Sequence, residues 1–187
     1  MFKNLKISLI LTTLTIIMFG LGYPFFFIAA GLLIPEKSTG SPVYAEGRIA
    51  GFENIGQNFT DDKYFNGRPS AVNYDASATG GSNKGPSNPE YLTEVQARID
   101  TFLIHNPDIS KSDIPSDLIT ASGSGIDPDI TPDAAYIQVK RISKNRSVSE
   151  EELRQIIKKN TDGKYLGIFG EERINLLKLN IELDKIH

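Results

Sequence analysis

Hydrophobic and polar residues divide the chain into a continuous apolar stretch near its start and a patterned remainder. No charged residue occurs from Ile7 to Ile34. A helix of about 20 apolar residues spans the hydrocarbon core of a bilayer, so the stretch predicts one transmembrane helix over residues 7–34. Pro24 lies inside it with Gly20 and Gly22 before it. We expect a kink there, which local adjustment of the helix can accommodate.

A cleaved signal peptide is the alternative interpretation of this stretch. Lys3 and Lys6 would form its positive region, and Val43 to Ala45 resemble a small-residue cleavage site. A signal peptide has only about 7–15 apolar residues, however, so the length favours a retained anchor. The two lysines precede the span without an acidic neighbour. The positive-inside rule therefore predicts residues 1–6 in the cytoplasm and the rest of the chain outside the cell membrane.

After the span, residues 35–42 (PEKSTGSP) have the composition of a short linker, and residues 43–187 form the predicted exported soluble domain. Weak alternation over residues 47–59 predicts one or two short strands. Glycine, proline, serine and asparagine dominate residues 61–90, which excludes long regular elements. Three aromatic residues in this segment favour an ordered, packed loop over a disordered one: Tyr64, Phe65 and Tyr74.

The first predicted helix of the domain follows this loop. Ser87 or Asn88 can cap it, Pro89 suits its first turn, and Asn106-Pro107 ends it. Its apolar residues recur every three or four positions, which indicates a face that packs on a core: Leu92, Val95, Ile99, Phe102 and Leu103.

Two more helices are predicted downstream. Thr131 caps one helix over residues 131–146, and Ser149 with Glu152 forms a capping box for the other. Basic residues near the end of the earlier helix fit its dipole and solvation better than an anion site: Lys140, Arg141, Lys144 and Arg146.

The tail from Arg173 to Ile186 alternates apolar and polar residues. Period two predicts a half-buried strand, with a helix as the second interpretation because leucine, lysine and glutamate favour helices. The predicted fold class is thus α+β: a single N-terminal transmembrane helix followed by one small exported α+β domain.

Composition excludes several kinds of chemistry. The chain has no cysteine, so it forms neither a disulfide nor a thiolate metal site. The formal net charge of −3 does not favour nucleic acid. Only two histidines occur, His105 near a predicted helix end and His187 at the terminus, which disfavours a histidine-based active site.

Residues 121–135 (ASGSGIDPDITPDAA) combine serines, glycines and aspartates in the manner of several functional loops. The serine spacing does not match a nucleophile elbow, and the glycine spacing matches no phosphate loop or dinucleotide fingerprint. Asp127, Asp129 and Asp133 lack the later glycine and glutamate of a calcium loop. What fits is a turn followed by a capped helix start.

Three long stretches resemble the KdpC family, the C subunit of the bacterial Kdp potassium-transporting P-type ATPase. They are residues 64–89, 114–142 and 166–184, behind an N-terminal span. Local departures are Asn66, Lys84 and the GEER segment at residues 170–173. None of them removes a glycine or proline of the core motifs.

The resemblance implies a non-catalytic subunit. Its partners would be a channel-like potassium-conducting subunit and a P-type subunit that hydrolyses ATP, and potassium would be the substrate of the complex. The family role is a catalytic chaperone that raises the ATP affinity of the hydrolysing subunit. Direct ATP binding conflicts with the predicted topology, because ATP is cytoplasmic.

No catalytic residue and no metal ligand is assigned. The candidate contacts with a partner or a nucleotide are Arg68, Pro69, Ser70, Ser82, Asn83, Gly85, Ser122, Gly123, Ser124, Gly125 and Asp127.

Two alternatives stay open at this point. The domain could instead form an external cap over the potassium entrance of the channel-like subunit, without nucleotide contact. It could also be an anchored exported hydrolase, for which Asp127 and Asp129 are the close acids in a motif context.

Overall fold

The computed structural model describes residues 2–186. The chain divides into two compact units, Met1–Pro42 and Val43–His187, called here the N-terminal and C-terminal units. Each unit is described by itself. A long apolar helix precedes a small domain of helices and short strands, which confirms the predicted fold class.

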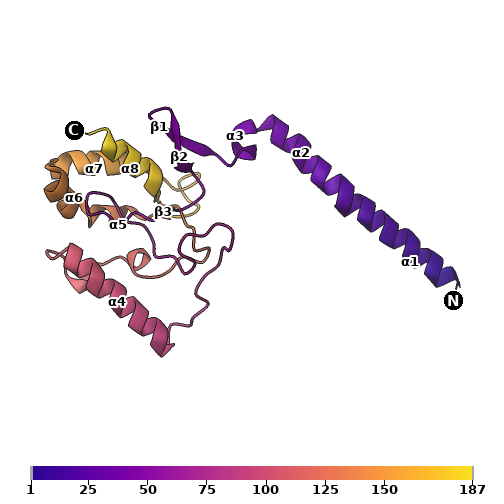
Figure 1. Cartoon of the computed structure of the whole chain (residues 1–187), viewed down its shortest axis with the longest axis horizontal. Helices are drawn as coiled ribbons and strands as arrows, with labels where there is room; N and C mark the ends of the chain where they lie inside the picture. The colour runs from indigo at the N-terminus through magenta and orange to yellow at the C-terminus, as the bar shows by residue number, and fades with distance from the viewer. Residues whose placement is uncertain (1, 187) are drawn as a thin grey trace. The chain divides into compact units, whose positions relative to one another are not determined.

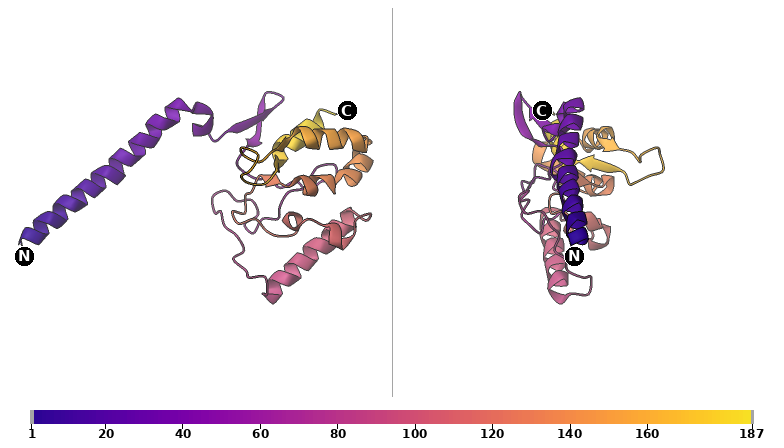
Figure 2. Two further views of the ribbon diagram at one scale, coloured as in Figure 1. Left: turned by 180° about the vertical axis from the view of Figure 1, so that it is seen from behind. Right: turned by 90° about the vertical axis from the view of Figure 1, so that its right-hand side faces the viewer.

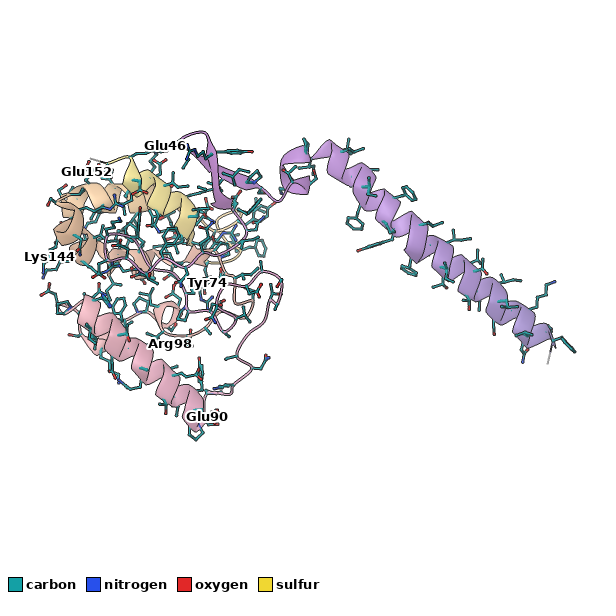
Figure 3. All side chains as sticks on the ribbon, viewed as in Figure 1. Glu46, Tyr74, Glu90, Arg98, Lys144 and Glu152 are labelled. Carbon is teal, nitrogen blue, oxygen red and sulfur yellow. The ribbon has the colours of Figure 1, made fainter. Side chains whose placement is uncertain are left out.

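The N-terminal unit is dominated by a continuous helix made of α1 (Phe2–Thr15), the π-helical stretch η1 (Ile16–Gly22) and α2 (Tyr23–Leu33) (Figure 1). These 32 residues are long and apolar enough to cross a membrane. Figure 3 shows side chains projecting from every side of this helix, and its large apolar residues are exposed. A one-turn helix, α3 (Pro35–Ser38), occupies part of the predicted linker.

The π-helical stretch accounts for how the helix accommodates Pro24. Proline has no N–H to donate to the preceding turn. Just before it, the Tyr23 N–H donates to the Met18 carbonyl, five residues back, as in a π-helix. The local adjustment expected from the sequence is therefore a widened turn, through which the helix continues without a break.

Two short paired strands follow, β1 (Pro42–Ala45) and β2 (Arg48–Phe52). Strand β2 confirms a short strand within residues 47–59, whereas β1 lies before that range and was not predicted. The next regular element is α4 (Pro89–His105), so the intervening segment is the expected long loop. The Asn88 side chain accepts the Tyr91 N–H at 3.1 Å and caps α4. Two 3₁₀ turns follow, η2 (Lys111–Asp113) and η3 (Ser116–Leu118).

The region predicted as one helix over residues 131–146 forms two. They are α5 (Pro132–Tyr136), capped by Thr131, and α6 (Val139–Arg146). The break includes Gln138, whose buried amide bonds backbone groups of other segments. The third predicted helix is α7 (Glu150–Lys159), and the Ser149 hydroxyl accepts the Glu152 N–H at 3.2 Å as expected.

The tail is where the first interpretation of the sequence was wrong. Strand β5 covers only Arg173–Asn175, and α8 (Leu176–Asp184) follows it as a helix. Strands β3 (Asp129–Ile130) and β4 (Thr161–Asp162) pair antiparallel with β5, giving the order β3-β5-β4. The buried face of α8 consists of Leu176, Leu177, Leu179, Asn180 and Leu183. A helix places residues 176, 179, 180 and 183 on one side, and the polar Asn180 obscures that pattern in the sequence.

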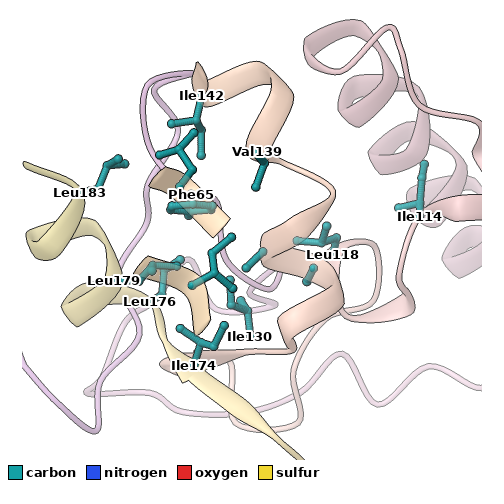
Figure 4. Packing of buried hydrophobic residues seen from close by; sticks show 14 of the residues in the cluster. Phe65, Ile114, Leu118, Ile130, Val139, Ile142, Ile174, Leu176, Leu179 and Leu183 are labelled. Carbon is teal, nitrogen blue, oxygen red and sulfur yellow. The ribbon is translucent and has the colours of Figure 1, made fainter. Parts of the chain in front are cut away.

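The core of the C-terminal unit lies between the helices that follow the long loop. Figure 4 shows Val139 and Ile142 of α6 on one side, and Leu176, Leu179 and Leu183 of α8 on the other. Phe65 lies among them and is fully buried. The long loop is thus packed, as its aromatic residues predicted.

Three buried polar side chains hold the loop against this core. Asn180 bonds both backbone groups of Phe65, accepting its N–H at 2.9 Å and donating to its carbonyl at 3.0 Å. Gln138 does the same for Asn66, at 2.8 and 3.1 Å. Burial of amides is favourable only with such partners. The loop is therefore fixed by its main chain as well as by Phe65.

Arg141 is the third of these side chains, and its position corrects the expectation that the basic cluster serves only the dipole and solvent. Its side chain is only 3% exposed. The guanidinium donates to the carbonyls of Asp62 and Tyr64 and to the side-chain oxygen of Asn66. Lys140 and Lys144 are exposed and pair with Asp108. The basic residues of the cluster therefore lie on different faces of α6, with Arg141 on the buried face and the two lysines on the exposed one.

Candidate functional site

Two glycine-rich segments that are distant in sequence lie against each other in the C-terminal unit. The Ser122 N–H donates to the Pro69 carbonyl at 3.1 Å, and the Gly80 N–H donates to the Ser124 carbonyl at 2.8 Å. The Gly56 N–H also donates to the Ile126 carbonyl, at 2.8 Å. We call this paired surface, residues 67–81 with residues 121–127, the loop junction.

Gly125 explains why the junction needs glycine. Its φ is +72°, in the left-handed region. A Cβ atom there would lie 2.5 Å from Val72 Cγ2 and 2.7 Å from the Gly80 carbonyl oxygen. At Gly81 a Cβ would approach the Gly123 carbonyl to 3.1 Å. These glycines permit two backbones to meet, which is a different use from cradling phosphate.

The serine hydroxyls of the junction accept hydrogen bonds from nearby backbone N–H groups. Ser70 Oγ accepts the N–H groups of Val72 and Tyr74 at 3.1 and 2.9 Å. Ser122 Oγ accepts the Gly125 N–H at 3.0 Å, and Ser124 Oγ accepts that of Ile126 at 3.2 Å. Each hydroxyl therefore fixes a turn rather than facing a general base.

One ion pair crosses the junction. Arg68 Nη1 lies 2.9 Å from Asp127 Oδ2, and both side chains are about three-quarters buried. The Tyr74 hydroxyl donates to the Arg68 carbonyl at 2.5 Å, and burial raises the pKa of that hydroxyl. Arg68 is the only cationic residue among the candidates. Because it is already paired with a carboxylate, it is poorly placed to bind a phosphate.

The structure unites only some of the candidate residues. Arg68, Pro69, Ser70, Ser122, Gly123, Ser124, Gly125 and Asp127 belong to the loop junction. Ser82, Asn83 and Gly85 do not hydrogen-bond to it within residues 2–186, and they lead into α4. Between them, Lys84 pairs with Glu94 at 2.6 Å, and Asn83 has a φ of +53°.

A cavity of about 470 Å³ lies beside the junction, between the long loop and α4. Tyr74 of the loop and Arg98 of α4 line it, and both are labelled in Figure 3. Phe59, Phe102 and His105 contribute to its walls. The sequence did not predict this cavity, because the apolar stripe of α4 indicated core alone. Ile99 is indeed buried, but Phe102 lines the cavity and Leu92 is 53% exposed.

His105 occupies the rim of this cavity without forming a catalytic pair with a serine. Its Nδ1 lies 2.8 Å from Asp62 Oδ1. Arg98 donates to the Ile119 carbonyl at 3.2 Å. His105 and Arg98 therefore both make structural contacts within the unit. His187, the other histidine, lies outside the described residues.

A second hollow, of about 880 Å³, lies on the other side of Asp127. Acidic residues outnumber basic ones in its lining. The basic residues are Arg68 and Arg173, and the acidic residues are Asp117, Asp127, Asp129, Asp162, Glu171 and Glu172. Burial raises the pKa of Asp129, which Arg173 partly offsets. Among residues 2–186, no group of three acidic or histidine side chains is arranged to hold a metal ion. Such a hollow repels phosphate groups.

Comparison with known proteins gives consistent results over nearly the whole chain. The family model described as KdpC, K⁺-transporting ATPase, c chain, matches residues 5–185. A potassium-transporting ATPase KdpC subunit of Bacteroides fragilis is 47% identical, over 98% of this chain and 96% of that protein. The corresponding subunit of Bacteroides thetaiotaomicron is 47% identical, over 99% and 97%. That of Caldanaerobacter subterraneus subsp. tengcongensis is 45% identical, over 97% and 94%.

Proposed function

Because the chain belongs to the KdpC family, the c chain of K⁺-transporting ATPases, we propose that it is a non-catalytic accessory subunit that caps the external mouth of the channel-like subunit. The observation that carries this proposal is the loop junction. Its backbones are joined by hydrogen bonds and its serines are held in turns. A surface that is fixed before binding loses little conformational entropy when a partner docks.

The absence of a catalytic role rests on how the reactive groups are used. The junction serines accept backbone N–H groups, and Arg68 is paired with Asp127. His105 contacts Asp62 rather than a nucleophile. An anchored hydrolase acting through Asp127 and Asp129 would need one of them free as a base. Asp127 accepts hydrogen bonds from Arg68 and from the Asp129 N–H, and Asp129 lies 3.6 Å from Arg173 and accepts the Asn175 amide at 3.5 Å. The geometry therefore favours recognition over hydrolysis.

The N-terminal helix supplies the membrane attachment in this proposal. Its large apolar side chains are exposed within the N-terminal unit, so they are available to lipid or to helices of the channel-like and ATP-hydrolysing subunits. In this proposal the start of the chain lies in the cytoplasm and the C-terminal unit outside, an orientation that Lys3 and Lys6 favour through the positive-inside rule. Potassium is then the ion that passes beneath the cap.

Chemical cross-linking in the assembled complex tests the cap. The chain has no cysteine, so Ala71→Cys and Ser124→Cys each introduce one attachment point for a cysteine-to-lysine cross-linker. We expect adducts with the channel-like subunit from both positions. Lys158→Cys on the exposed face of α7 is the control, and the cysteine-free chain is the blank. Absence of adducts from both junction positions in an intact complex would refute the cap.

Protease treatment of spheroplasts tests the orientation. We expect an external protease to remove the C-terminal unit, while an epitope at the N-terminus resists until the membrane is broken. Protection of the C-terminal unit would reverse the topology and place it on the side where ATP is found.

The family role of raising ATP affinity is the second candidate function. The cavity between the long loop and α4 favours it, since about 470 Å³ is within the range of small-molecule sites and its walls include Phe59 and Tyr74. A base could stack on these aromatic rings. However, the guanidinium of Arg98 in its wall already donates to the Ile119 carbonyl, which makes the cavity poor at binding a triphosphate.

Photolabelling of the complex with azido-ATP tests this role. A nucleotide bound in the cavity predicts a labelled peptide from this chain, and predicts that Phe102→Ala raises the KM for ATP without lowering kcat. Leu92→Ala, on the exposed part of α4, is the control. If only the hydrolysing subunit is labelled and the KM is unchanged, direct nucleotide binding is excluded, and any effect on ATP affinity acts through contacts between subunits.

A further inference from the structure

The hairpin between β4 and β5 carries a group of large apolar side chains that the rest of the C-terminal unit does not cover. Tyr165, Leu166, Ile168 and Phe169 are 74, 74, 76 and 61% exposed. The right-hand view of Figure 2 shows this hairpin extending away from the helices. Apolar residues gathered in this way on a protein surface mark interaction sites far more often than scattered ones.

The tip of the hairpin is ordered by its own backbone. Tyr165 and Phe169 exchange N–H to carbonyl bonds at 2.8 and 2.9 Å. Leu166 and Gly167 form the turn, with φ of +53° and +73°. Such turns favour asparagine or aspartate before the glycine, so a leucine there is held at a conformational cost. Leu166 is also 74% exposed, so burial within residues 43–186 does not offset this cost.

Acidic residues surround this apolar tip. Asp162, Glu171 and Glu172 are exposed at its base and line the acidic hollow together with Tyr165 and Phe169. We call the four apolar residues with these three acids the hairpin surface. Lys164 and Arg173 belong to the hairpin and Arg68 lines the same hollow, but Arg173 lies 3.6 Å from Asp129 and Arg68 lies 2.9 Å from Asp127. The surface is therefore apolar at its tip and negative at its base.

This charge distribution indicates which kind of partner would cover the apolar tip: a lipid bilayer, a second copy of this chain or another protein. A bilayer with anionic lipids would meet the acids as like charges. A second copy of this chain, docked tip to tip, would bring two acidic bases together. A protein surface with an apolar recess rimmed by lysine or arginine matches both features. Aromatic and leucine anchors that enter a recess are typical of the centres of protein interfaces.

We infer that the hairpin surface is a docking element for an extramembrane part of another subunit of the same complex, one that presents an apolar recess with a basic rim. This inference rests on the proposed function for the existence of a partner. It adds a contact that is separate from the loop junction. The tip anchors the contact, and the acids at its base set its orientation and its salt dependence.

Substitution at the tip is the first test. In the complex purified from membranes through a tag on this chain, Leu166→Ser with Ile168→Ser should lower the amount of the other subunits by about ten-fold, a loss of about 1.4 kcal/mol of binding free energy when two anchors are removed. Leu92→Ser with Ile104→Ser removes two exposed apolar residues from α4 and is the matched control. Equal recovery from both double variants overturns the inference. Failure of the unsubstituted chain to recover any subunit instead refutes the proposed function.

Charge reversal separates protein from lipid. Glu171→Lys with Glu172→Lys should weaken recovery of the partner and remove its sensitivity to salt. If the tip instead entered an anionic membrane, the same change would leave recovery of the partner and its salt dependence unaltered, because the acids would not face a basic rim. Unaltered recovery and salt dependence overturn the inference.

Photochemical cross-linking identifies the occupant directly. p-Benzoylphenylalanine placed at position 169 should form an adduct with a peptide of another subunit that contains apolar residues near lysine or arginine, identified by mass spectrometry. The same group placed at position 104 on α4 is the control. An adduct with lipid, or with a second copy of this chain, contradicts the inference.

Discussion

Gly125 is the residue on which the loop junction depends most. It combines a φ of +72° with contacts on both sides of the position where a side chain would start. Arg141 and Asn180 act at the same scale, because each fixes backbone groups of the loop that have no strand to pair with. Single side chains therefore perform the role that a sheet ladder performs in other domains.

Replacing Gly125 with alanine should lower the free energy of unfolding by about 1–3 kcal/mol, through left-handed strain and overpacking against Val72. Gly123→Ala is a control two residues away, since nothing lies within 4 Å of a Cβ there. We expect it to change stability by less than about 0.5 kcal/mol. Urea unfolding of both variants is the measurement, and equal effects would contradict the packing account.

Replacing Arg141 with methionine should cost about 3 kcal/mol, because buried acceptors on Tyr64 and Asn66 lose their donor. Lys140→Met removes a neighbouring cation that is exposed and pairs only with Asp108. That control should cost less than about 1 kcal/mol. Similar losses for the two variants would mean that Arg141 does not hold the loop.

Asp129 gives a pH dependence with a definite sign. Burial raises its pKa above the ordinary value of 3.8. The folded state then holds the proton more tightly than the unfolded state, so stability falls as pH rises through the interval above 3.8. Asp129→Asn should therefore raise the melting temperature at pH 7, and the gain should shrink as the pH approaches 4.

The pKa of Asp75 is shifted in the opposite direction from that of Asp129, so Asp75 serves as the comparison. Hydrogen bonds from Ser77 lower its pKa, so it contributes stability at neutral pH that disappears on acidification. Asp75→Asn should not raise the melting temperature at pH 7. If both variants shifted stability in the same direction, the assignment for Asp129 would be wrong.

At the scale of elements, the helices differ in what holds them. Helix α7 has a serine cap, three glutamates in its first turn and two lysines in its last, so local sequence favours it strongly. Helix α8 has no acidic first turn and no basic last turn, and it is defined by the face it buries. Helices α5 and α6 are separated at Gln138, where a buried amide bonds the long loop.

The cap of α7 provides the prediction at this scale. Ser149→Ala leaves the Glu152 N–H without its acceptor and should cost about 1 kcal/mol. Ser149→Asp restores an acceptor at the positive end of the dipole and should retain most of the stability. Thermal unfolding followed by circular dichroism compares the three proteins. Equal loss from alanine and aspartate would indicate that the cap is not what stabilises α7.

At the scale of the molecule, the apolar core belongs to the C-terminal unit. Among residues 2–186, every core residue and every partly buried apolar residue packed on it lies between Phe59 and Ile186. The described residues of the N-terminal helix, 2–33, have no buried side chain. The C-terminal unit therefore contains its own apolar core.

A chain of residues 43–187 should accordingly fold by itself, with cooperative urea unfolding and a stability of about 5–15 kcal/mol. Arg141→Met should have the same effect in it as in the full chain in detergent. Loss of cooperative unfolding on removal of residues 1–42 would show that the membrane segment takes part in folding.

The sequence by itself determined the features that depend on neighbours along the chain. They include the apolar stretch long enough for a membrane, the caps at Thr131 and Ser149, and the irregular course of the long loop. For α4 the sequence offered Ser87 or Asn88 as the cap, and the structure shows Asn88. Helix starts and membrane length can be predicted because each depends on a few consecutive residues. The family was also identifiable from its long motifs.

Only the tertiary structure decided which polar residues are interior. Asn180 makes α8 resemble a strand in the sequence, because its burial depends on Phe65, far away along the chain. Arg141 resembles a solvated cation for the same reason. The glycines and serines of residues 121–125 form a junction because Gly80 and Pro69, which belong to another loop, hydrogen-bond to them. A buried polar group is stable only with its partner, and folding alone brings that partner to it.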